Sequence, residues 1–469
     1  MNSFEMNKTA KNLCIIFILI STASISGPFL SPNSSSHQYH GTQIIIHPVE
    51  LTKDILKDID YVIVFDGGST GTRMHIFSFI TNQDSKLQKL ILDKEEFYHI
   101  SPGLSSYFNN VSGAAVSIEP LIKKALTSVP AIFAKETPMI LKATAGLRLL
   151  PKDISNSILD VIEKRFKLLP FEVKSGDVSM LTEQDEGLFA WYTVNFLQHK
   201  LHKINESIAT LDLGGASTQI TFSTYDLYTL VKSSHYIVQR SIEGELEFLY
   251  THSYLGNGLM AARKAILSHN NQFAEKNHSE KNTKNYGYYE RTVKSPCFKS
   301  LGNETLIWKQ DRDIYHIRYN ESITNNPWKE CLQIVHRFVL RSNIDQPEEL
   351  KFREIYAMSY FYDRMKDIRV VKHESGRVKI RDFFIYADHV CNGAIKLRKQ
   401  SPFLCLDLIY IASYLHDGLG LPMNKDIMLV KKINGIETSW ALGAAINLFH
   451  GYINDNSTMT ISDIEHSCH

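Results

Sequence analysis

Two short apolar runs that end in small and polar residues form the clearest pattern along the chain. Residues 61–65 (YVIVF) are apolar and largely β-branched, which is typical of a buried strand, and they run into Asp66 and GGSTGT. Residues 208–211 (IATL) run in the same way into Asp212 and LGGAST, with the strand-like ITF after them. Because the two Asp residues lie 146 positions apart (212 minus 66), about one domain length, the pattern predicts a duplication of two α/β domains.

Two further segments lie between these strands, and each predicts a helix with polar residues at its start. Thr144 follows an apolar run (residues 139–141) and is a candidate phosphate contact or a plain helix cap. Residues 182–197 (TEQDEGLFAWYTVNFL) begin with Glu183, Asp185 and Glu186 and continue as an apolar helix. Acidic residues at such a position often only offset the helix dipole, so composition does not decide which of the three is a general base.

Glycine-rich turns at strand ends are suited to bind anions such as phosphate. Without a Cβ, backbone N–H groups can approach an anion closely, and Ser and Thr hydroxyls add donors. An Asp beside them can hold a divalent cation, directly or through water. Two such turns facing each other would hold a polyphosphate from both sides, and a pair of capped tight turns is the alternative. Neither turn is a P-loop or a Rossmann turn.

The composition is that of an ordinary globular protein. Of 469 residues, 43% are hydrophobic and 22% are charged, which argues against a largely disordered chain. The formal net charge is +1, whereas a general nucleic-acid binder would carry a large basic excess. Any phosphate must therefore be recognised locally.

The N-terminus predicts a targeting segment rather than part of the fold. Residues 13–20 (LCIIFILI) are apolar, basic residues precede them, and small residues follow. We expect residues 1–27 to be a signal peptide or a signal anchor, with cleavage favoured, and residues 28–45 to be a linker. No other segment predicts a membrane span. N-x-S/T sequons support secretion or residence in the ER or Golgi lumen; they lie at Asn33, Asn110, Asn205, Asn277, Asn303, Asn320 and Asn456.

Six cysteines fit an oxidising compartment. We expect sequence neighbours to pair, Cys297 with Cys331 and Cys391 with Cys405, although four cysteines allow three pairings. Cys14 lies in the targeting segment, and Cys468 has no assigned partner. No C-x-x-C pair occurs, so a metal site is disfavoured for these residues.

Five segments together resemble the conserved regions of the ecto-nucleoside triphosphate diphosphohydrolase, or apyrase, family. They are VFDGGSTGTRMHIFSF (64–79), LKATAGLRLLP (141–151), TEQDEGLFAWYTVNFL (182–197), IATLDLGGASTQITF (208–222) and ETSWALGAAINL (437–448). Order and spacing both fit, and the resemblance covers most of the chain after residue 60. The GGSTGTR form of the first motif is similar to the soluble, secretory-pathway branch, which favours nucleoside diphosphates. Gly67 stands where many relatives have Ala.

The resemblance implies an α/β fold of two ribonuclease-H-like domains, as in actin, Hsp70 and sugar kinases, with the active site between them. The N-terminal lobe would span residues 46–180 and be completed by about 435–469. The C-terminal lobe would span residues 181–434.

The resemblance also implies roles for individual residues. Glu186 would be the catalytic base, and Ser217 and Gln219 would position the attacking water. A cation would be held, mostly through water, by Asp66, Asp212, Thr144, Glu186 and Trp440. The phosphate would contact Gly68, Ser69, Thr70, Gly71, Thr72, Arg73, Thr144, Gly214, Gly215 and Ala216. Tyr360 or Tyr362, together with Tyr410, would stack on the base, and burial in the core is the alternative for these tyrosines.

The expected reaction is hydrolysis of the terminal phosphate of nucleoside diphosphates such as UDP and GDP, with Mg²⁺ or Ca²⁺ as cofactor. Triphosphates are further candidate substrates. A broad apyrase acting on ATP and ADP is the alternative, followed by a sugar kinase, an Hsp70-like switch and an inactive nucleotide-binding protein. We expect a monomer that binds no nucleic acid and touches a membrane only through an uncleaved N-terminal segment.

Overall fold

The structure is a computed structural model that describes most of the chain after residue 58. The described residues are 59–68, 70–82, 89–201, 206–242, 245–269, 289–310, 313–319, 326–395, 401–448 and 453–455. The predicted targeting segment and linker, five of the seven sequons, Ser69, Cys14 and Cys468 lie outside them. Among the described helices, none has the length and apolar character to cross a bilayer.

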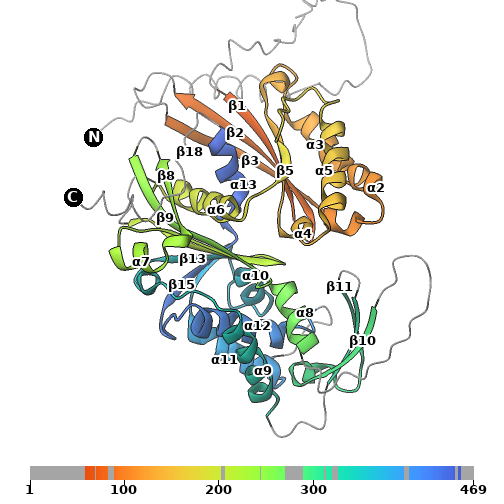
Figure 1. Ribbon diagram of the computed structural model, residues 1–469, viewed down its shortest axis with the longest axis vertical. Helices are drawn as coiled ribbons and strands as arrows, with labels where there is room; N and C mark the ends of the chain where they lie inside the picture. Colours follow the sequence, from red (N-terminus) through yellow and green to blue (C-terminus); the bar gives the residue numbers. More distant parts are fainter. Residues whose placement is uncertain are drawn as a thin grey trace, which may run out of the picture. The chain divides into compact units, whose positions relative to one another are not determined.

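Two sheets with the same strand order organise the described residues (Figure 1). The first has the order β3-β2-β1-β4-β5 and is formed by Lys89–Ile100, Thr72–Asn82, Ile59–Gly67, Met139–Ala143 and Val178–Met180. The second contains the order β9-β7-β6-β13-β15, formed by Glu245–Leu255, Ser217–Ser223, Ala209–Leu213, Ile355–Ser359 and Asp426–Val430. In both, the central strand pairs antiparallel on one side and parallel on the other.

This correspondence confirms the predicted α/β fold with two similar lobes. Each sheet has two antiparallel strands, a central strand that ends in an Asp-containing turn, and two parallel strands. The second sheet is longer. Antiparallel β14 (Ser375–Lys379) extends it beyond β15, and β8 (Ile237–Ile242) and β18 (Ile453–Asp455) extend it beyond β9.

Residues 61–65 of β1 (Ile59–Gly67) form an apolar run because both faces of their sheet are covered. Ile63 and Phe65 face a core that includes α2 (Val111–Ser117), α3 (Glu119–Ser128) and α5 (Lys152–Phe166). Val62 and Val64 face the other core, formed with α6 (Glu183–Leu197) and α13 (Trp440–Leu448). Figure 1 shows these two groups of helices on opposite sides of the first sheet. Alternation of side chains along a strand explains why a parallel strand buried on both faces reads as a continuous apolar run.

Helices α6 and α13 pack directly on each other and connect the two sheets. Helix α6 also contacts the second sheet, and α13 contacts β1 and β2 of the first. A Cβ at Gly443 would lie 2.1 Å from the carbonyl oxygen of Phe189, so only glycine permits this approach. Thr193 Oγ1 donates to the carbonyl of Ser439 (2.7 Å) and accepts from the N–H of Gly443 (2.9 Å). The starts of both helices therefore lie at a fixed spacing beside the turns after β1 and β6.

The second lobe carries additional helices and a small sheet. The helices are α8 (Leu259–His269), α9 (Pro327–Arg341), α10 (Tyr360–Asp367), α11 (Ile380–Cys391) and α12 (Leu404–Ser413), and the small sheet has the order β10-β12-β11, formed by Tyr289–Ser295, Asp313–Tyr319 and Leu306–Gln310. Both predicted disulfides are confirmed: Cys297 bonds Cys331, and Cys391 bonds Cys405. The first attaches the end of the small sheet to α9, and the second joins α11 to α12.

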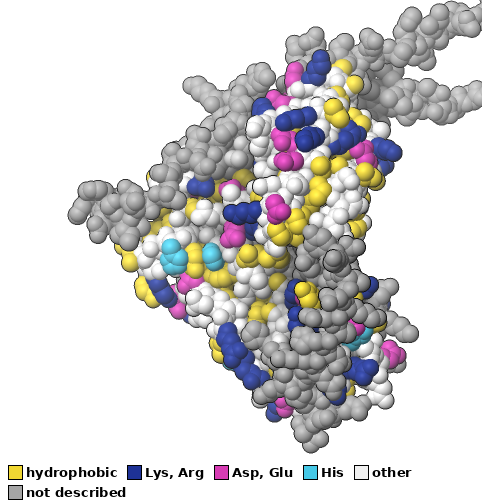
Figure 2. Space-filling view, turned by 45° about the vertical axis from the view of Figure 1, so that its right-hand side comes forward, with side chains coloured by type: hydrophobic (Ala, Val, Ile, Leu, Met, Phe, Trp, Pro, Cys, Tyr) yellow, Lys and Arg dark blue, Asp and Glu magenta, His cyan; other side chains and the backbone are white. Residues whose placement is uncertain are grey.

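On the face drawn in Figure 2, acidic and basic side chains are interspersed rather than segregated. This arrangement agrees with the net charge of +1. The described surface of this face thus offers no extended basic patch for a polyanion.

Replacing Cys297 and Cys331 by Ser should lower the free energy of unfolding by about 2–5 kcal/mol. This disulfide spans 34 residues and the other spans 14, so loss of Cys297–Cys331 releases more chain entropy in the unfolded state. Denaturant unfolding of the two paired variants measures the difference. A larger loss for the Cys391–Cys405 pair would contradict this expectation.

Candidate active site

Most of the predicted site residues line one cleft between the two sheets. The residues that do so are Asp66, Gly68, Thr70, Arg73, Thr144, Glu186, Asp212, Gly214, Gly215, Ala216, Ser217, Gln219, Tyr360 and Trp440. They lie where β1, β4 and β6 end and where α6, α10 and α13 begin. The carboxyl ends of parallel strands are the usual place for a ligand in α/β folds.

Gly71 and Thr72 are next to the cleft rather than in its lining. A Cβ at Gly71 would lie 2.3 Å from His99 Nε2, so Gly71 allows the first turn to pack against β3. Thr72 is fully buried at the start of β2. Their positions indicate that Gly71 and Thr72 support the turn. Ser69 lies outside the described residues.

Geometry distinguishes the three acidic residues at the start of α6. Glu183 is 44% exposed, and its carboxylate lies 3.8 Å from Arg148 Nη1. Asp185 accepts a hydrogen bond from Thr182 Oγ1 at 2.6 Å, and its own N–H donates back to that hydroxyl, as in a helix cap. The side chain of Glu186 is only 10% exposed and lies in the cleft, where it accepts from Arg148 Nη2 at 2.5 Å.

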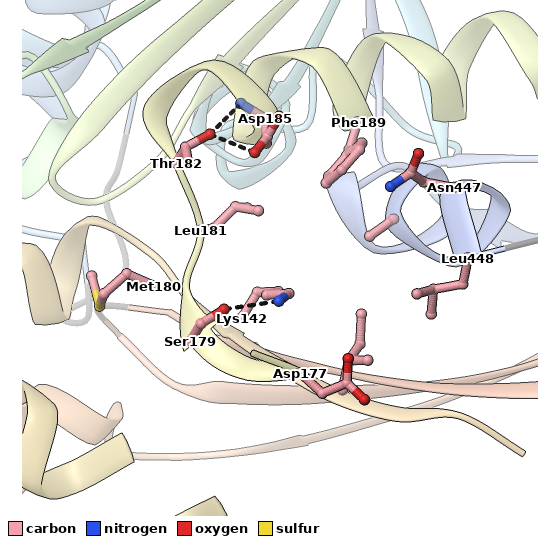
Figure 3. Close-up of a pocket in the computed structure, with 12 residues that line it drawn as sticks. Lys142, Asp177, Ser179, Met180, Leu181, Thr182, Asp185, Phe189, Asn447 and Leu448 are labelled. Atoms are coloured by element: carbon pink, nitrogen blue, oxygen red, sulfur yellow. Dashed lines mark hydrogen bonds between the residues drawn. The ribbon is translucent and has the colours of Figure 1, made fainter. Parts of the chain in front are cut away.

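Asp185 faces a different pocket, which Figure 3 shows between α6, α13 and the end of the first sheet. Lys142 lies in that pocket and donates to Ser179 Oγ at 2.8 Å. Apolar side chains such as Leu181 and Phe189 form much of the wall. The pocket contains neither glycine turn, so Asp185 and Glu186, neighbours in sequence, face different surroundings.

Burial gives Glu186 an unusual pKa. Removal from water raises its pKa to about 7, against a lowering contribution from Arg148 and further raising contributions from Asp212 and Asp66. A carboxylate with a pKa near 7 is suited to accept a proton at neutral pH.

Asp66 and Asp212 end equivalent strands and lie on opposite walls of the cleft. Asp66 Oδ2 accepts from Arg73 Nη1 at 3.0 Å. Burial raises the pKa of Asp212, a hydrogen bond from Ser359 lowers it, and the charge of Asp66 raises it again. Ser359 has φ 56°, a left-handed conformation unusual for serine that is commonly retained only where the surroundings require it.

These two carboxylates fit a hydrated divalent cation. Among the described residues, Oδ1 of Asp66 and Oδ1 of Asp212 are buried without a hydrogen-bond partner in the protein. Buried carboxylate oxygens facing a polar cleft are the donors that Mg²⁺ and Ca²⁺ prefer. No cluster of three His, Cys, Asp or Glu side chains forms a direct metal site among the described residues.

Ser217 and Gln219 are oriented by a buried hydrogen-bond network on β7. Gln219 Nε2 donates to Ser217 Oγ at 2.7 Å and to Ser253 Oγ at 2.9 Å. Both N–H groups are thereby used, and a water in the cleft could be held only through Oε1 of this amide. Ser253, on β9, was not identified from the sequence.

The second glycine turn is held from behind by the start of α8. The carbonyl oxygens of Gly214 and Gly215 accept from Leu259 and Met260, at 2.9 and 2.8 Å. A Cβ at Gly258 would lie 2.3 Å from the backbone nitrogen of Ser217, so this contact requires glycine. With both carbonyl groups turned toward α8, the turn can present N–H groups to an anion.

The three candidate tyrosines have different places. Tyr360 lines the cleft, and the guanidinium carbon of Arg364 lies 5.3 Å from its ring centroid. Tyr362 is buried and donates to the carbonyl of His373 at 2.8 Å. Tyr410 is fully buried and donates to the carbonyl of Asn257. The core-packing alternative therefore describes Tyr362 and Tyr410, and only Tyr360 is placed to stack on a base.

Sequence reasoning missed several residues in the cleft or bonded to its lining. Arg148 was noted in its motif without a role, although it bonds Glu186 across 38 residues. The other missed residues are Ser359, Asp363, Lys431, Glu437, Thr438 and Ser439. The polar residues at the ends of β13 and β15 could have signalled them, since β13 is the parallel neighbour of β6 and β15 is the next parallel strand.

Comparisons with known proteins point to one family. The model of the GDA1/CD39 (nucleoside phosphatase) family matches residues 53–460. The chain is 38% identical over 392 residues to the human nucleoside diphosphate phosphatase ENTPD5, covering 83% of this chain and 87% of that protein. It is 37% identical over 396 residues to mouse ectonucleoside triphosphate diphosphohydrolase 6, covering 84% and 82%.

A solved structure supports the fold. The crystal structure of nucleoside triphosphate hydrolases from Neospora caninum superimposes with a TM-score of 0.55 at 13% identity, covering 84% of this chain and 93% of that chain. The matched family model and the two relatives confirm the resemblance found in the sequence motifs. The chain belongs to the GDA1/CD39 (nucleoside phosphatase) family.

Proposed function

We propose that this protein hydrolyses the terminal phosphate of nucleoside diphosphates of the UDP and GDP type, yielding a nucleoside monophosphate and phosphate. The observation that carries the proposal is a buried glutamate with a raised pKa in a cleft that has a glycine turn on each wall. The name nucleoside diphosphate phosphatase, borne by a relative that is 38% identical, favours diphosphates over a broad apyrase activity.

Different cleft residues have different roles in the proposed reaction. Backbone N–H groups of the two turns, at Gly68 and Thr70 and at Gly215 and Ala216, hold the terminal phosphate as its charge shifts. Ser217 and Gln219 Oε1 orient a water, and Glu186 takes its proton as the oxygen attacks phosphorus. Tyr360 stacks on the base. No phosphoenzyme is required.

Asp66 and Asp212 would hold Mg²⁺ or Ca²⁺ through its water shell, with Thr144 and Trp440 beside them. A bound cation supplies charge neutralisation for the phosphate oxygens. The buried Oδ1 atoms of the two Asp residues support this assignment.

Phosphate release from purified full-length protein tests the function. We expect the highest kcat/KM with UDP or GDP, weaker activity with ATP and UTP, and none after chelation of divalent cations. A strong preference for ATP would move the assignment to a broad apyrase. Phosphate transfer to a sugar hydroxyl, with no free phosphate from nucleotide alone, would indicate a kinase.

Replacing Arg148 by Met should shift the acid limb of the kcat/KM profile to higher pH. Arg148 lowers the pKa of Glu186, so its loss leaves burial less opposed and raises that pKa further above its usual value. The base must be ionised, so activity should fall more at pH 6 than at pH 8. Arg148→Lys keeps the charge and should keep most of the profile. An unchanged acid limb in Arg148→Met would contradict the coupling.

We further propose a monomer in the lumen of the secretory pathway. Asn110 and Asn303, the sequons within the described residues, are both exposed, and two disulfides are present. Protein expressed through the secretory pathway should lose mass on endoglycosidase treatment, and Asn303→Gln should remove part of that shift. A shift identical to that of the unaltered chain would argue against a glycan at Asn303.

A further inference from the structure

Lys431 is a cleft residue for which neither the sequence motifs nor the proposed mechanism has a role. It follows β15 directly, and its side chain is 39% exposed in the cleft. Its ammonium lies 2.8 Å from Glu437 Oε1, and its backbone N–H donates to the carbonyl of Glu374 at 2.7 Å. Both ends of the residue are thus held by the protein.

The partner of Lys431 is held from the first lobe. The N–H of Glu437 donates to Glu95 Oε2 on β3 at 2.7 Å, and Glu95 Oε1 lies 2.7 Å from Nδ1 of the buried His75. Between Lys431 and Glu437, a tight hairpin joins β16 (Lys432–Ile433) to β17 (Ile436–Glu437), turning through Asn434 and Gly435 at φ 53° and 82°. Lys431 is therefore fixed in place rather than free on a long loop.

Lys431 and Glu186 each follow the last strand of a parallel series, one series in each sheet. Glu186 lies just after β5, the last strand of the series β1-β4-β5. Lys431 lies just after β15, the last of the three strands β6-β13-β15. The first strands of the two series, β1 and β6, end near Asp66 and Asp212. Glu186 is bonded to Arg148, which follows β4 of the first sheet, whereas Lys431 follows β15 of the second.

Hydrogen bonds and strand order divide the cleft residues in the same way. Arg148, which donates to Glu186, follows β4 of the first sheet. Burial lowers the pKa of Lys431, while Glu437 and Asp363 raise it more, and Arg73 opposes them. The pKa of Tyr360, raised by burial, is in turn lowered by several Arg residues that include Arg73. Tyr360 directly follows β13, the parallel neighbour of β15, so Tyr360 and Lys431 mark the end of the cleft beside the second sheet, and Glu186 and Arg148 mark the other end.

Phosphoryl transfer needs the attacking and leaving oxygens roughly in line with phosphorus. With water activated at the Glu186 end, the leaving group must depart toward the end that holds Tyr360 and Lys431. For a nucleoside diphosphate, that leaving group is a nucleoside monophosphate with its own phosphate. We propose that Lys431 donates hydrogen bonds to this α-phosphate and so recognises the leaving group. This inference rests on the proposed function.

The electron balance of the step is simple. The bond from the bridging oxygen to the terminal phosphorus breaks, and its electron pair stays on the bridging oxygen of the monophosphate. The oxygen of water bonds to the terminal phosphorus, and its proton goes to Glu186. Lys431 transfers no proton; its ammonium offsets the charge that the α-phosphate gains. Lys431 therefore does not stabilise the leaving group of a substrate when that leaving group carries no phosphate.

The test compares Lys431→Met with Lys432→Met. Lys432 is the next residue in the chain, and its side chain is not in the cleft lining, so it is a matched control. We expect Lys431→Met to lower kcat/KM for UDP roughly 10- to 100-fold and to weaken UMP binding by a similar factor, with uridine binding unchanged. Hydrolysis of p-nitrophenyl phosphate should change less than twofold. Lys431→Arg should restore part of the UDP activity, and Lys432→Met should match the unaltered protein.

Equal losses of UMP and uridine binding, with an unchanged melting temperature, would overturn the proposal, because they would indicate a general effect on the cleft. UDP hydrolysis and UMP binding that both stay within twofold of the unaltered protein would also overturn it. The binding measurements stand apart from catalysis. If the unaltered protein fails to hydrolyse UDP, the proposed function fails, while a loss of UMP but not uridine binding in Lys431→Met still supports a phosphate contact.

Discussion

Replacing Glu186 by Gln should lower kcat for nucleoside diphosphates roughly 10²- to 10⁴-fold, the usual contribution of a positioned general base. The amide keeps the size of the side chain and can still accept a hydrogen bond from Arg148, so the cleft should keep its shape. It cannot take a proton from water. Phosphate release at saturating substrate, followed over hours, measures the residual rate.

The free energy of unfolding of Glu186→Gln should change little or increase. Burial raises the pKa of Glu186, so the charged form costs the folded state free energy at pH values above the pKa that this group has in the unfolded chain. Arg148 offsets part of that cost. The neutral amide removes the penalty together with the ion pair, and a melting temperature within a few degrees of that of the unaltered protein would show that lost activity is not lost folding.

Asp185→Asn is the matched control for this prediction. It changes an acidic residue one position earlier on the same helix turn, and that side chain faces the separate pocket of Figure 3. We expect its kcat to stay within about threefold of that of the unaltered protein, since it only supports the helix cap. Near-normal turnover in Glu186→Gln, or an equal loss in Asp185→Asn, would refute the assignment of the base.

The parts of this site that sequence could predict are those carried by short contiguous patterns. An apolar strand that ends in Asp and a glycine turn indicates Asp66 and Asp212 by local geometry alone. The disulfides were predictable because Cys297 and Cys331, and Cys391 and Cys405, are neighbours among the cysteines. A helix with three acidic residues at its start narrows the base to three candidates, and the family resemblance selects Glu186.

The parts that sequence could not predict depend on contacts between distant segments. The pairing of Arg148 with Glu186 requires the end of β4 and the start of α6 to meet, and the contact of Glu437 with Glu95 spans 342 residues. Tyr360 and Tyr362 are two positions apart on one helix. Which of them faces the cleft depends on how α10 is set on the sheet, and no local pattern encodes that rotation.

Asp212→Asn should abolish most cation-dependent activity and at the same time stabilise the folded protein. Asp66 has Arg73 as a close cationic partner, whereas Asp212 accepts its hydrogen bond from the neutral hydroxyl of Ser359, and the charges of Arg73 and Lys431 lower its pKa by less. A buried carboxylate without a close positive charge is retained at a cost in stability.

The sign of the stability change follows from the pKa. Burial raises the pKa of Asp212 above its usual value, so deprotonation costs more in the folded than in the unfolded state. The penalty is therefore absent well below the usual pKa and grows as the pH rises above it. In EDTA at pH 7, the melting temperature of Asp212→Asn should exceed that of the unaltered protein, and at pH 3 the two should converge.

Added Mg²⁺ or Ca²⁺ should then reverse the order of stability. A cation that binds only the folded state stabilises the unaltered protein by mass action, and the variant should bind it roughly 10- to 100-fold more weakly. Asp177→Asn, a change in the separate pocket, should respond to cations as the unaltered protein does. If Asp212→Asn keeps full activity in EDTA, or melts lower than the unaltered protein without cations, then Asp212 is a structural carboxylate. A higher melting point without cations, together with a lost response to them, would mean that the protein sacrifices stability at this position to hold the charge that its phosphate chemistry needs.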